Sequence, residues 1–544
     1  MKKKSVALLL AAVLALGTVL TGCSSNGGSS KDGKSLTVGV GAQFTTLDPG
    51  LNTEEINSYV MQHTCAGLFI KDDEGNVNED LADSYEVSED GLTYTVTLKD
   101  GLEWSDGEPL TAYDFEYGLK RNLVYGAENA WAINDPCKYL EGAEEIGGKS
   151  DLEVEDLEDF EGVKALDDKT IQYNLKKPCA FFTSVLLDQV FLPLREDFID
   201  VHSSDWAMEG GYPSVGPYKL VECNDIEKCV IEKNDKYYKA DEVTLDKITF
   251  MVMTDADAQE AAFKTGNLDV ALGVKDTVVD SYENQNEVWM LPSVAVYFIA
   301  LNSGESGPEA LKDVNVRKAL ALGLDKEAMS EKMGPLYPAI NGYVPSGMQG
   351  ASDDFRAEGD AQGKMLEYDP EEAKALLAEA GYDESNPLKI TYKYSDSSTH
   401  SDVAQLIEQE WKKIGVEVEL QVVESGVFYD QLDNGDFETA RYGYVGATDP
   451  SAYLDLWTTS MQVVPAVSDP TFDKMVEDAS YIVDRTEYME ALHEAEHYLV
   501  EENAYIIPLF DYGSAGLVKE NVKNIHCAPG GRPYYGNVTL EDAE

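Results

Sequence analysis

The N-terminal segment limits which part of this chain can fold. Lys2 to Lys4 form a basic start, and Ser5 to Leu20 is an almost unbroken apolar run. This run is shorter than the roughly 20 residues that a membrane-spanning helix needs, so it predicts a secretory signal. Residues 24–34 contain no apolar side chain and are rich in Ser and Gly, which is typical of a flexible tether. A folded body in an exported compartment must therefore be built from residue 35 onward.

A single cysteine follows the apolar run. Leu20-Thr21-Gly22-Cys23 resembles the lipobox of bacterial lipoproteins. The resemblance implies that residues 1–22 are removed as a signal peptide and that Cys23 becomes an acylated first residue, with residues 23–34 as a lipidated tether. Because two or more acyl chains give stable anchoring, we expect attachment to the outer face of the cell membrane through lipid alone. An ordinary signal peptide with a chance cysteine is the alternative.

The composition predicts several domains with a substantial core. The 544-residue chain is 43% hydrophobic and carries 31 tyrosines, which excludes an intrinsically disordered protein. Its formal net charge of −59 repels the phosphates of nucleic acids and of anionic lipids, so we expect neither as a partner. The acidity leaves two interpretations open: a preference for cationic ligands, or simply a well-solvated exterior.

Short strands alternate along the chain with amphipathic helices, which favours a mixed α/β fold. No internal repeat and no long linker follow residue 34, so we expect the domains to share one compact body. Alternating apolar residues predict strands at Leu36–Val40, Thr93–Leu98, Lys169–Leu175, Lys228–Glu232, Lys247–Val252 and Lys389–Tyr394. Helical periodicity with start and stop signals predicts helices at Pro370–Ala380, Val403–Ile414 and Tyr488–Glu501.

The cysteines after Cys23 do not form a metal or redox motif. No CxxC pair occurs, which argues against a thiolate zinc site and a thioredoxin-like centre. Cys223 and Cys229 flank a turn between two predicted strands. A disulfide across this hairpin is sterically reasonable and an exported location permits it. Free buried thiols are the other interpretation, and the sequence leaves the choice open.

Five blocks of sequence carry a family resemblance. They are Lys99–Phe115, Ser214–Tyr218, Val314–Leu320, Leu376–Tyr382 and Trp411–Val416. Together and in this order they resemble the peptide and nickel class of ABC-transporter binding proteins, most of all oligopeptide-binding lipoproteins. Each block also has a structural explanation, such as Thr111 capping a helix after an Asp-Gly turn. The blocks therefore support the fold more than a binding site.

The resemblance implies a two-lobed α/β fold of the type II periplasmic-binding-protein kind, with an additional domain inserted in the first lobe. Hinges are expected near residues 300–302 and 506–508, where the lobes would rotate to close around a ligand. Carried onto this sequence, the first lobe would comprise residues 35–70, 205–298 and 505–544, the inserted domain 71–204, and the second lobe 299–504.

The resemblance also implies ligand-binding residues in the second lobe. Arg441 would bind a peptide carboxylate through a bidentate guanidinium. Gly443 and Val445 would pair with the ligand backbone and Tyr444 would wall a pocket. His400 matches a position that reaches the C-terminal end of the ligand. The alternatives are a surface or internally paired Arg441, ordinary interface packing for Tyr444 and for Tyr512, and an exposed loop histidine.

Further candidates lie in the first lobe and the inserted domain. Tyr512 and the Glu54-Glu55 loop match positions that line the first lobe, and Trp131 is a candidate in the inserted domain. Oligopeptide binders place an aspartate in the loop after Val445 to hold the peptide α-amine, but the best match of this chain to that loop puts Ala447 or a one-residue deletion there. Either Asp449 or the Glu54-Glu55 pair replaces that anchor, or the ligand has no free amine.

The implied function is binding and delivery without catalysis. The resemblance implies a monomer with no catalytic residue, metal or cofactor, which captures short peptides and presents them to an ABC permease and its ATPase subunits. A non-peptide ligand on the same fold is the first alternative.

A zinc peptidase is the alternative from another functional class. His493-Glu494-Ala495-Glu496-His497 matches H-E-x-x-H, whose histidines share one helix face. Glu520 is the downstream acid with tolerable spacing for a third ligand. However, period-3.6 packing places Leu492 toward the core and both histidines toward solvent, which favours an ordinary surface helix.

Overall fold

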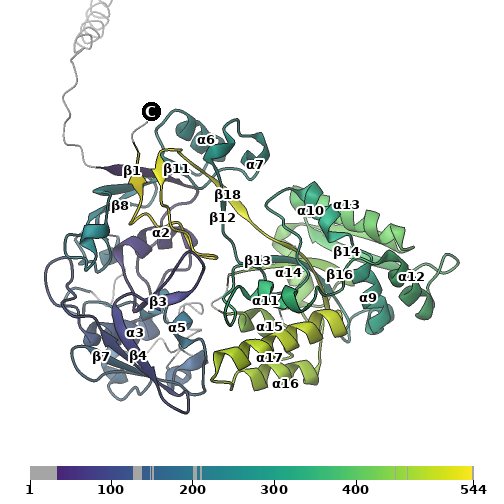
Figure 1. Cartoon of the computed structure of the whole chain (residues 1–544), viewed down its shortest axis with the longest axis horizontal. Helices are drawn as coiled ribbons and strands as arrows, with labels where there is room; N and C mark the ends of the chain where they lie inside the picture. Colours follow the sequence, from purple (N-terminus) through teal and green to yellow (C-terminus); the bar gives the residue numbers. More distant parts are fainter. Residues whose placement is uncertain are drawn as a thin grey trace, which may run out of the picture.

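A computed structural model describes residues 34–125, 136, 138–146, 149, 152–199, 205–208, 211–446, 449–461 and 463–541. Two lobes lie side by side, each built on its own β-sheet (Figure 1). A third, smaller sheet belongs to a domain that lies below the first-lobe sheet in this view. Within the described residues, no helix is long and apolar enough to cross a membrane.

The first lobe contains a seven-stranded mixed sheet in the order β12-β18-β11-β1-β10-β9-β8. Strand β1 runs parallel to both β10 and β11, and its residues Leu36, Val38 and Val40 are fully buried. A disulfide between Cys223 and Cys229 joins the β8–β9 hairpin, so the crosslinked alternative is the one the structure shows. The elements are β1 (Ser35–Val40), β8 (Tyr218–Asn224), β9 (Lys228–Lys233), β10 (Lys247–Val252), β11 (Val270–Ala271), β12 (Val288–Leu291), β18 (Ser514–Val518), α2 (Glu55–Thr64), α6 (Ala256–Lys264) and α7 (Val278–Ser281).

The inserted domain has a four-stranded antiparallel sheet in the order β4-β5-β7-β6. Alternate residues of β5 are buried in the same core cluster as the apolar residues of α3, as the apolar alternation of β5 predicts. The elements are β4 (Ala82–Val87), β5 (Thr93–Leu98), β6 (Val163–Ala165), β7 (Thr170–Asn174), α3 (Ala112–Tyr125) and α5 (Phe182–Val185), with the hairpin β2 (Phe69–Lys71) and β3 (Val77–Glu79) beside them.

A buried ion pair joins the inserted domain to the first lobe. Arg121, in α3, donates two hydrogen bonds to the carboxylate of Asp48, at 2.5 and 2.6 Å. Asp48 follows β1, and both side chains are essentially inaccessible to water. The pair satisfies two charges that neither domain could bury alone.

The second lobe contains a five-stranded sheet in the order β15-β14-β16-β13-β17. Strand β13 lies between β16 and β17, and its seven residues are all buried. The strands are β13 (Ala295–Leu301), β14 (Lys389–Ser395), β15 (Glu417–Val423), β16 (Thr439–Val445) and β17 (Ile506–Asp511). The helices are α8 (Glu309–Lys312), α9 (Val314–Leu322), α10 (Lys326–Met333), α11 (Phe355–Gln362), α12 (Pro370–Glu379), α13 (Ser398–Lys413), α14 (Ser425–Asp433), α15 (Ser451–Asp455), α16 (Pro470–Ala479) and α17 (Arg485–His497).

The chain changes lobes at positions other than those expected. All of β13 and β17 belong to the second-lobe sheet, although we expected residues 295–298 and 505–511 in the first lobe and hinges at 300–302 and 506–508. The crossings lie instead between Leu291 and Ala295 and between Asp511 and Ser514. The apolar run of β13 continues without a break through residue 298, so sequence periodicity does not mark the change of sheet.

The inserted domain also touches the second lobe. Lys138 pairs with Asp455 at 2.7 Å, and the ring of Phe181 stacks on Tyr488 with centroids 5.6 Å apart. These contacts supplement the two covalent crossings and hold the two lobes in their observed arrangement.

We predict that Arg121→Met lowers the free energy of unfolding by about 3–5 kcal/mol, because it leaves the buried Asp48 carboxylate without a partner. Chemical denaturation, followed by tryptophan fluorescence, measures this loss as a shift of the first unfolding transition to a lower denaturant concentration. Lys474→Met is the matched control, since its ion pair with Asp478 is exposed and should contribute less than about 1 kcal/mol. Equal effects of the two substitutions would contradict the assignment.

Candidate functional site

Arg441 is a buried cation in the second-lobe sheet. It lies on β16 and is 8% exposed. Its guanidinium donates to the hydroxyls of Ser395 (3.0 Å) and Tyr429 (3.1 Å) and lies over the ring of Phe428, 5.1 Å from the centroid. Among the described residues, no carboxylate is within ion-pair distance of Arg441, and its Nε has no hydrogen-bond partner. The guanidinium can therefore still accept a carboxylate ligand.

Aromatic residues from other elements surround this arginine. The Tyr297 hydroxyl is 3.3 Å from Nδ1 of His400, and the Tyr297 ring is 6.4 Å from that of Tyr512. Burial first, and the nearby Arg441 charge second, lower the pKa of His400 to about 4. His400 is thus neutral at pH 7. We call Tyr297, His400, Tyr429, Arg441 and Tyr512 the Arg441 cluster.

Among the residues that the structure describes, none forms a β-ladder with one edge of the backbone at the end of β16. The strand pairs with β13 along residues 439–445, but β14 pairs with it only at Thr439 and Ala440. Gly446 donates its N–H to the Val294 carbonyl at 2.9 Å. Because alternate residues of an antiparallel ladder point to opposite neighbours, Gly443 and Val445 direct their backbone groups away from β13. This edge lies beside Arg441 and can pair with an extended chain.

Tyr444 and Val445 differ in their surroundings. The Tyr444 ring packs edge-on against Tyr453 at 5.2 Å and is partly buried, whereas Val445 is 66% exposed. Tyr512 contacts the Tyr337 ring at 5.5 Å and donates its N–H to the carbonyl of Ala295, so it is held at a crossing between the lobes.

Asp449 is an internal carboxylate in this structure. It is 2% exposed and accepts hydrogen bonds from the Ser451 N–H (3.0 Å) and the Tyr488 hydroxyl (2.6 Å). Arg485 is 3.9 Å from its other oxygen. Burial raises the pKa of Asp449, although these partners oppose the shift.

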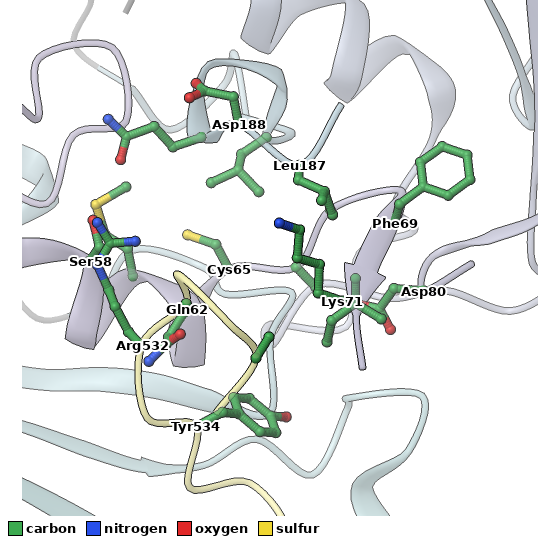
Figure 2. A pocket seen from close by; sticks show the side chains of 18 of the residues that line it. Ser58, Gln62, Cys65, Phe69, Lys71, Asp80, Leu187, Asp188, Arg532 and Tyr534 are labelled. Atoms are coloured by element: carbon green, nitrogen blue, oxygen red, sulfur yellow. The ribbon is translucent and has the colours of Figure 1, made fainter. Parts of the chain in front are cut away.

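The first lobe and the inserted domain form a separate pocket of about 530 Å³. Glu54 and Glu55, at the start of α2, are exposed and line it. Figure 2 shows side chains from β2 and from the C-terminal segment around Arg532 entering the same space. The Glu55 candidate therefore lies in this first-lobe pocket, whereas Arg441 lies in the second lobe.

Three expectations fall outside the described residues. Trp131, the lipidation site Cys23 and the loop position Ala447 all lie in segments that the structure does not describe.

The H-E-x-x-H segment lies in α17, but one of its histidines is not on the surface. His493 is 7% exposed and stacks on Phe355 with ring centroids 3.9 Å apart, so its predicted solvent-facing position is wrong. The reason is that α11 covers this face of α17, which helical periodicity cannot indicate. His497 is half-exposed, as expected. Glu520 bonds to Asn284 in the first lobe, and no group of three metal-ligating residues occurs in the described part of the chain.

Sequence reasoning missed several members of these sites. Arg441 donates hydrogen bonds to Ser395 on β14 and to Tyr429 on α14, and its charge acts on Tyr297 on β13. Nothing in the local sequence of these three residues indicates that they lie near Arg441. Lys71 and Arg532 also line the first-lobe pocket. The sequence did contain a signal for Arg532, because Gly530-Gly531-Arg532-Pro533 is a turn-like segment with a cation.

The sequence of this chain is similar to those of known solute-binding proteins. The family model for the middle part of bacterial extracellular solute-binding proteins of family 5 matches residues 76–463. The oligopeptide-binding protein OppA of Bacillus subtilis is 30% identical over 537 residues, which cover 95% of each chain. The probable deoxycholate-binding periplasmic protein YgiS of Escherichia coli is 28% identical and covers 88% of each chain.

Solved structures share the fold. The murein tripeptide binding protein MppA in its unliganded open form superposes with a TM-score of 0.81 at 25% identity, covering 94% of this chain and 98% of that one. A second structure of MppA from Escherichia coli gives 0.66. The expected two-lobed type II fold with an inserted domain is confirmed. The chain belongs to the bacterial extracellular solute-binding proteins of family 5.

Proposed function

We propose that this protein captures extended peptides between its two lobes and delivers them to an ABC permease and its ATPase subunits. The observation that carries the proposal is a buried arginine without a carboxylate partner beside a free strand edge. Arg441 would bind the C-terminal carboxylate, and the free edge at Gly443 and Val445 would pair with the peptide backbone. Backbone pairing gives affinity without reading side chains.

The relatives support a peptide ligand and also define the alternative. OppA of Bacillus subtilis is an oligopeptide-binding protein by name, whereas YgiS carries a probable deoxycholate-binding function. A non-peptide ligand therefore stays the second candidate. The free β16 edge favours the peptide, because a steroid acid has a carboxylate but no backbone amides to pair with it.

The remaining site assignments follow from exposure. Asp449 is buried and its carboxylate already accepts two hydrogen bonds, whereas Glu54 and Glu55 are exposed in the first-lobe pocket. We assign the peptide α-amine to the Glu54-Glu55 pair on this ground. Rotation about the two crossings would then bring these acids toward Arg441 and enclose the ligand.

The proposal also covers location and mechanism. The protein acts as a monomer on the outer face of the membrane, held by lipid at Cys23, and carries out no catalysis. The lipobox resemblance supports the anchor, and membership of a solute-binding family supports the absence of chemistry.

The carboxylate assignment predicts a specific loss in Arg441→Gln. For a short peptide with a free C-terminus, we expect binding to weaken at least about tenfold, because a charge-assisted bidentate contact is lost. The same peptide with a C-terminal amide should bind both proteins equally weakly. Isothermal titration calorimetry measures all four affinities. Equal binding of acid and amide by the wild type, or tight binding of deoxycholate in place of peptide, would refute the assignment.

His400 provides an independent reporter of the same site. Burial is the larger cause of the low pKa of His400 and the Arg441 charge is the second, so Arg441→Gln should raise this pKa from about 4 part of the way toward 6.5, and so should a bound peptide carboxylate. Binding would then favour the protonated imidazole, so affinity should rise as the pH falls through the interval between the free and bound pKa values. NMR titration of the His400 ring, assigned with His400→Gln, measures both shifts. A pKa unchanged by peptide would place the carboxylate elsewhere.

The anchor assignment predicts a change in fractionation. Cys23→Ala removes the acylation site, so we expect the variant to leave the membrane fraction while the wild type needs detergent for release. Immunoblots of both fractions test this expectation. A variant that still sediments with membranes would show that another feature anchors the chain.

A further inference from the structure

Two cations line the first-lobe pocket without any acidic partner. Lys71, at the end of β2, and Arg532, in the C-terminal segment, enter the space from opposite sides of Cys65 (Figure 2). Among the described residues, neither side chain makes a salt bridge or a hydrogen bond, and Nε of Arg532 is buried without a partner. This chain has 101 acidic and 42 basic residues, so acidic partners are abundant. Two cations that face a pocket without such a partner therefore indicate a site for an anionic ligand.

The acidic residues of the same pocket are mostly engaged by the protein itself. Asp80 accepts a hydrogen bond from the Tyr238 hydroxyl at 2.5 Å, with Lys239 at 4.0 Å. Asp188 accepts the Val190 N–H at 2.9 Å and so caps a short helical turn. Glu54 and Glu55 are exposed. The carboxylates nearest the interior thus have protein donors, whereas the two cations have no protein acceptors.

Asp449 is the remaining candidate partner for Lys71. The Asp449 charge acts on Lys71, whose pKa is lowered by burial and raised in part by this carboxylate. However, Asp449 is 2% exposed, and its oxygens are directed to Ser451, Tyr488 and Arg485. A direct pair with Lys71 would require these contacts to break, so Lys71 stays available to a ligand.

We propose that Lys71 and Arg532 form a subsite for a carboxylate group carried by a side chain of the bound peptide. This inference rests on the proposed function and narrows it to ligands with an acidic side chain. The C-terminal carboxylate is assigned to Arg441 in the second lobe, so a second pair of cations in the first lobe indicates a second negative group. A pocket of about 530 Å³ accommodates such a side chain with water.

The subsite would act as a specificity determinant that operates before closure. Arg532 supplies a planar fork that suits a carboxylate and Lys71 supplies a compact charge, so the pair recognises charge more than shape. A glutamine of the same size offers no negative charge. The ratio of affinities for Glu and Gln at one peptide position therefore measures the subsite directly.

Calorimetry on the purified full-length chain tests the subsite. The ligands are alanine-based tetrapeptides with a single Glu or Gln at each position in turn, and inorganic phosphate alone. We expect Glu to bind at least about tenfold more tightly than Gln at one position. In Lys71→Met/Arg532→Gln that preference should fall below about threefold, while the Gln peptide binds as in the wild type. Lys236→Met/Lys275→Gln removes two charges from exposed ion pairs and should keep the preference.

The outcomes separate this inference from the proposed function. If the peptides bind with no Glu preference at any position, the subsite is refuted and peptide binding stands; this comparison needs only the wild type, whatever the variants do. If no peptide binds, the proposed function fails first. If phosphate binds to the wild type but not to the double variant and Glu has no advantage, the anion is a free phosphate and the side-chain assignment is wrong. If the Glu preference is lost equally in Lys236→Met/Lys275→Gln, the assignment of the subsite to Lys71 and Arg532 is also wrong.

Discussion

The arrangement of the molecule depends on two adjacent chain crossings. On one side, β12 pairs with β18 in the first-lobe sheet, with Leu291 opposite Ser514. On the other, β13 pairs with β17 in the second-lobe sheet, with Val296 opposite Asp511. Backbone hydrogen bonds therefore hold both crossing strands immediately before and after the change of sheet. Only the few residues between them can absorb a rotation, which is the geometry of a hinge.

The cations of the two lobes follow a common physical pattern. A buried guanidinium is costly unless it is compensated, and Arg441 is compensated by two hydroxyls and an aromatic face rather than by a carboxylate. Such partners stabilise the charge without neutralising it. The neutral His400 nearby adds no further positive charge. By contrast, Arg121 is paired with Asp48 and carries a structural role.

Local elements were predictable because their signals are local. Thr93–Leu98 and Lys247–Val252 agree with the observed β5 and β10, since alternation directly reflects one buried face. The helix at Pro370 begins as its Asp-Pro start predicts, with Asp369 accepting two backbone N–H groups. Predictions failed where a neighbouring element decides the outcome. His493 is covered by α11, and β13 is buried along its whole length, so neither the exposure of His493 nor the lobe boundary can be seen in one segment.

The sequence by itself determined the mixed α/β class, the position of several strands and helices, and the family, because each depends on residues close together in the chain. It also identified Arg441 and the strand that carries it. Only the tertiary structure decided that Arg441 lacks a carboxylate partner, that the β16 edge is free from Gly443 onward, and that Lys71 and Arg532 share a pocket. These properties depend on residues from different elements of the chain, and on what is absent around a side chain. Periodicity and spacing do not encode such absences, because they arise only when distant elements pack together.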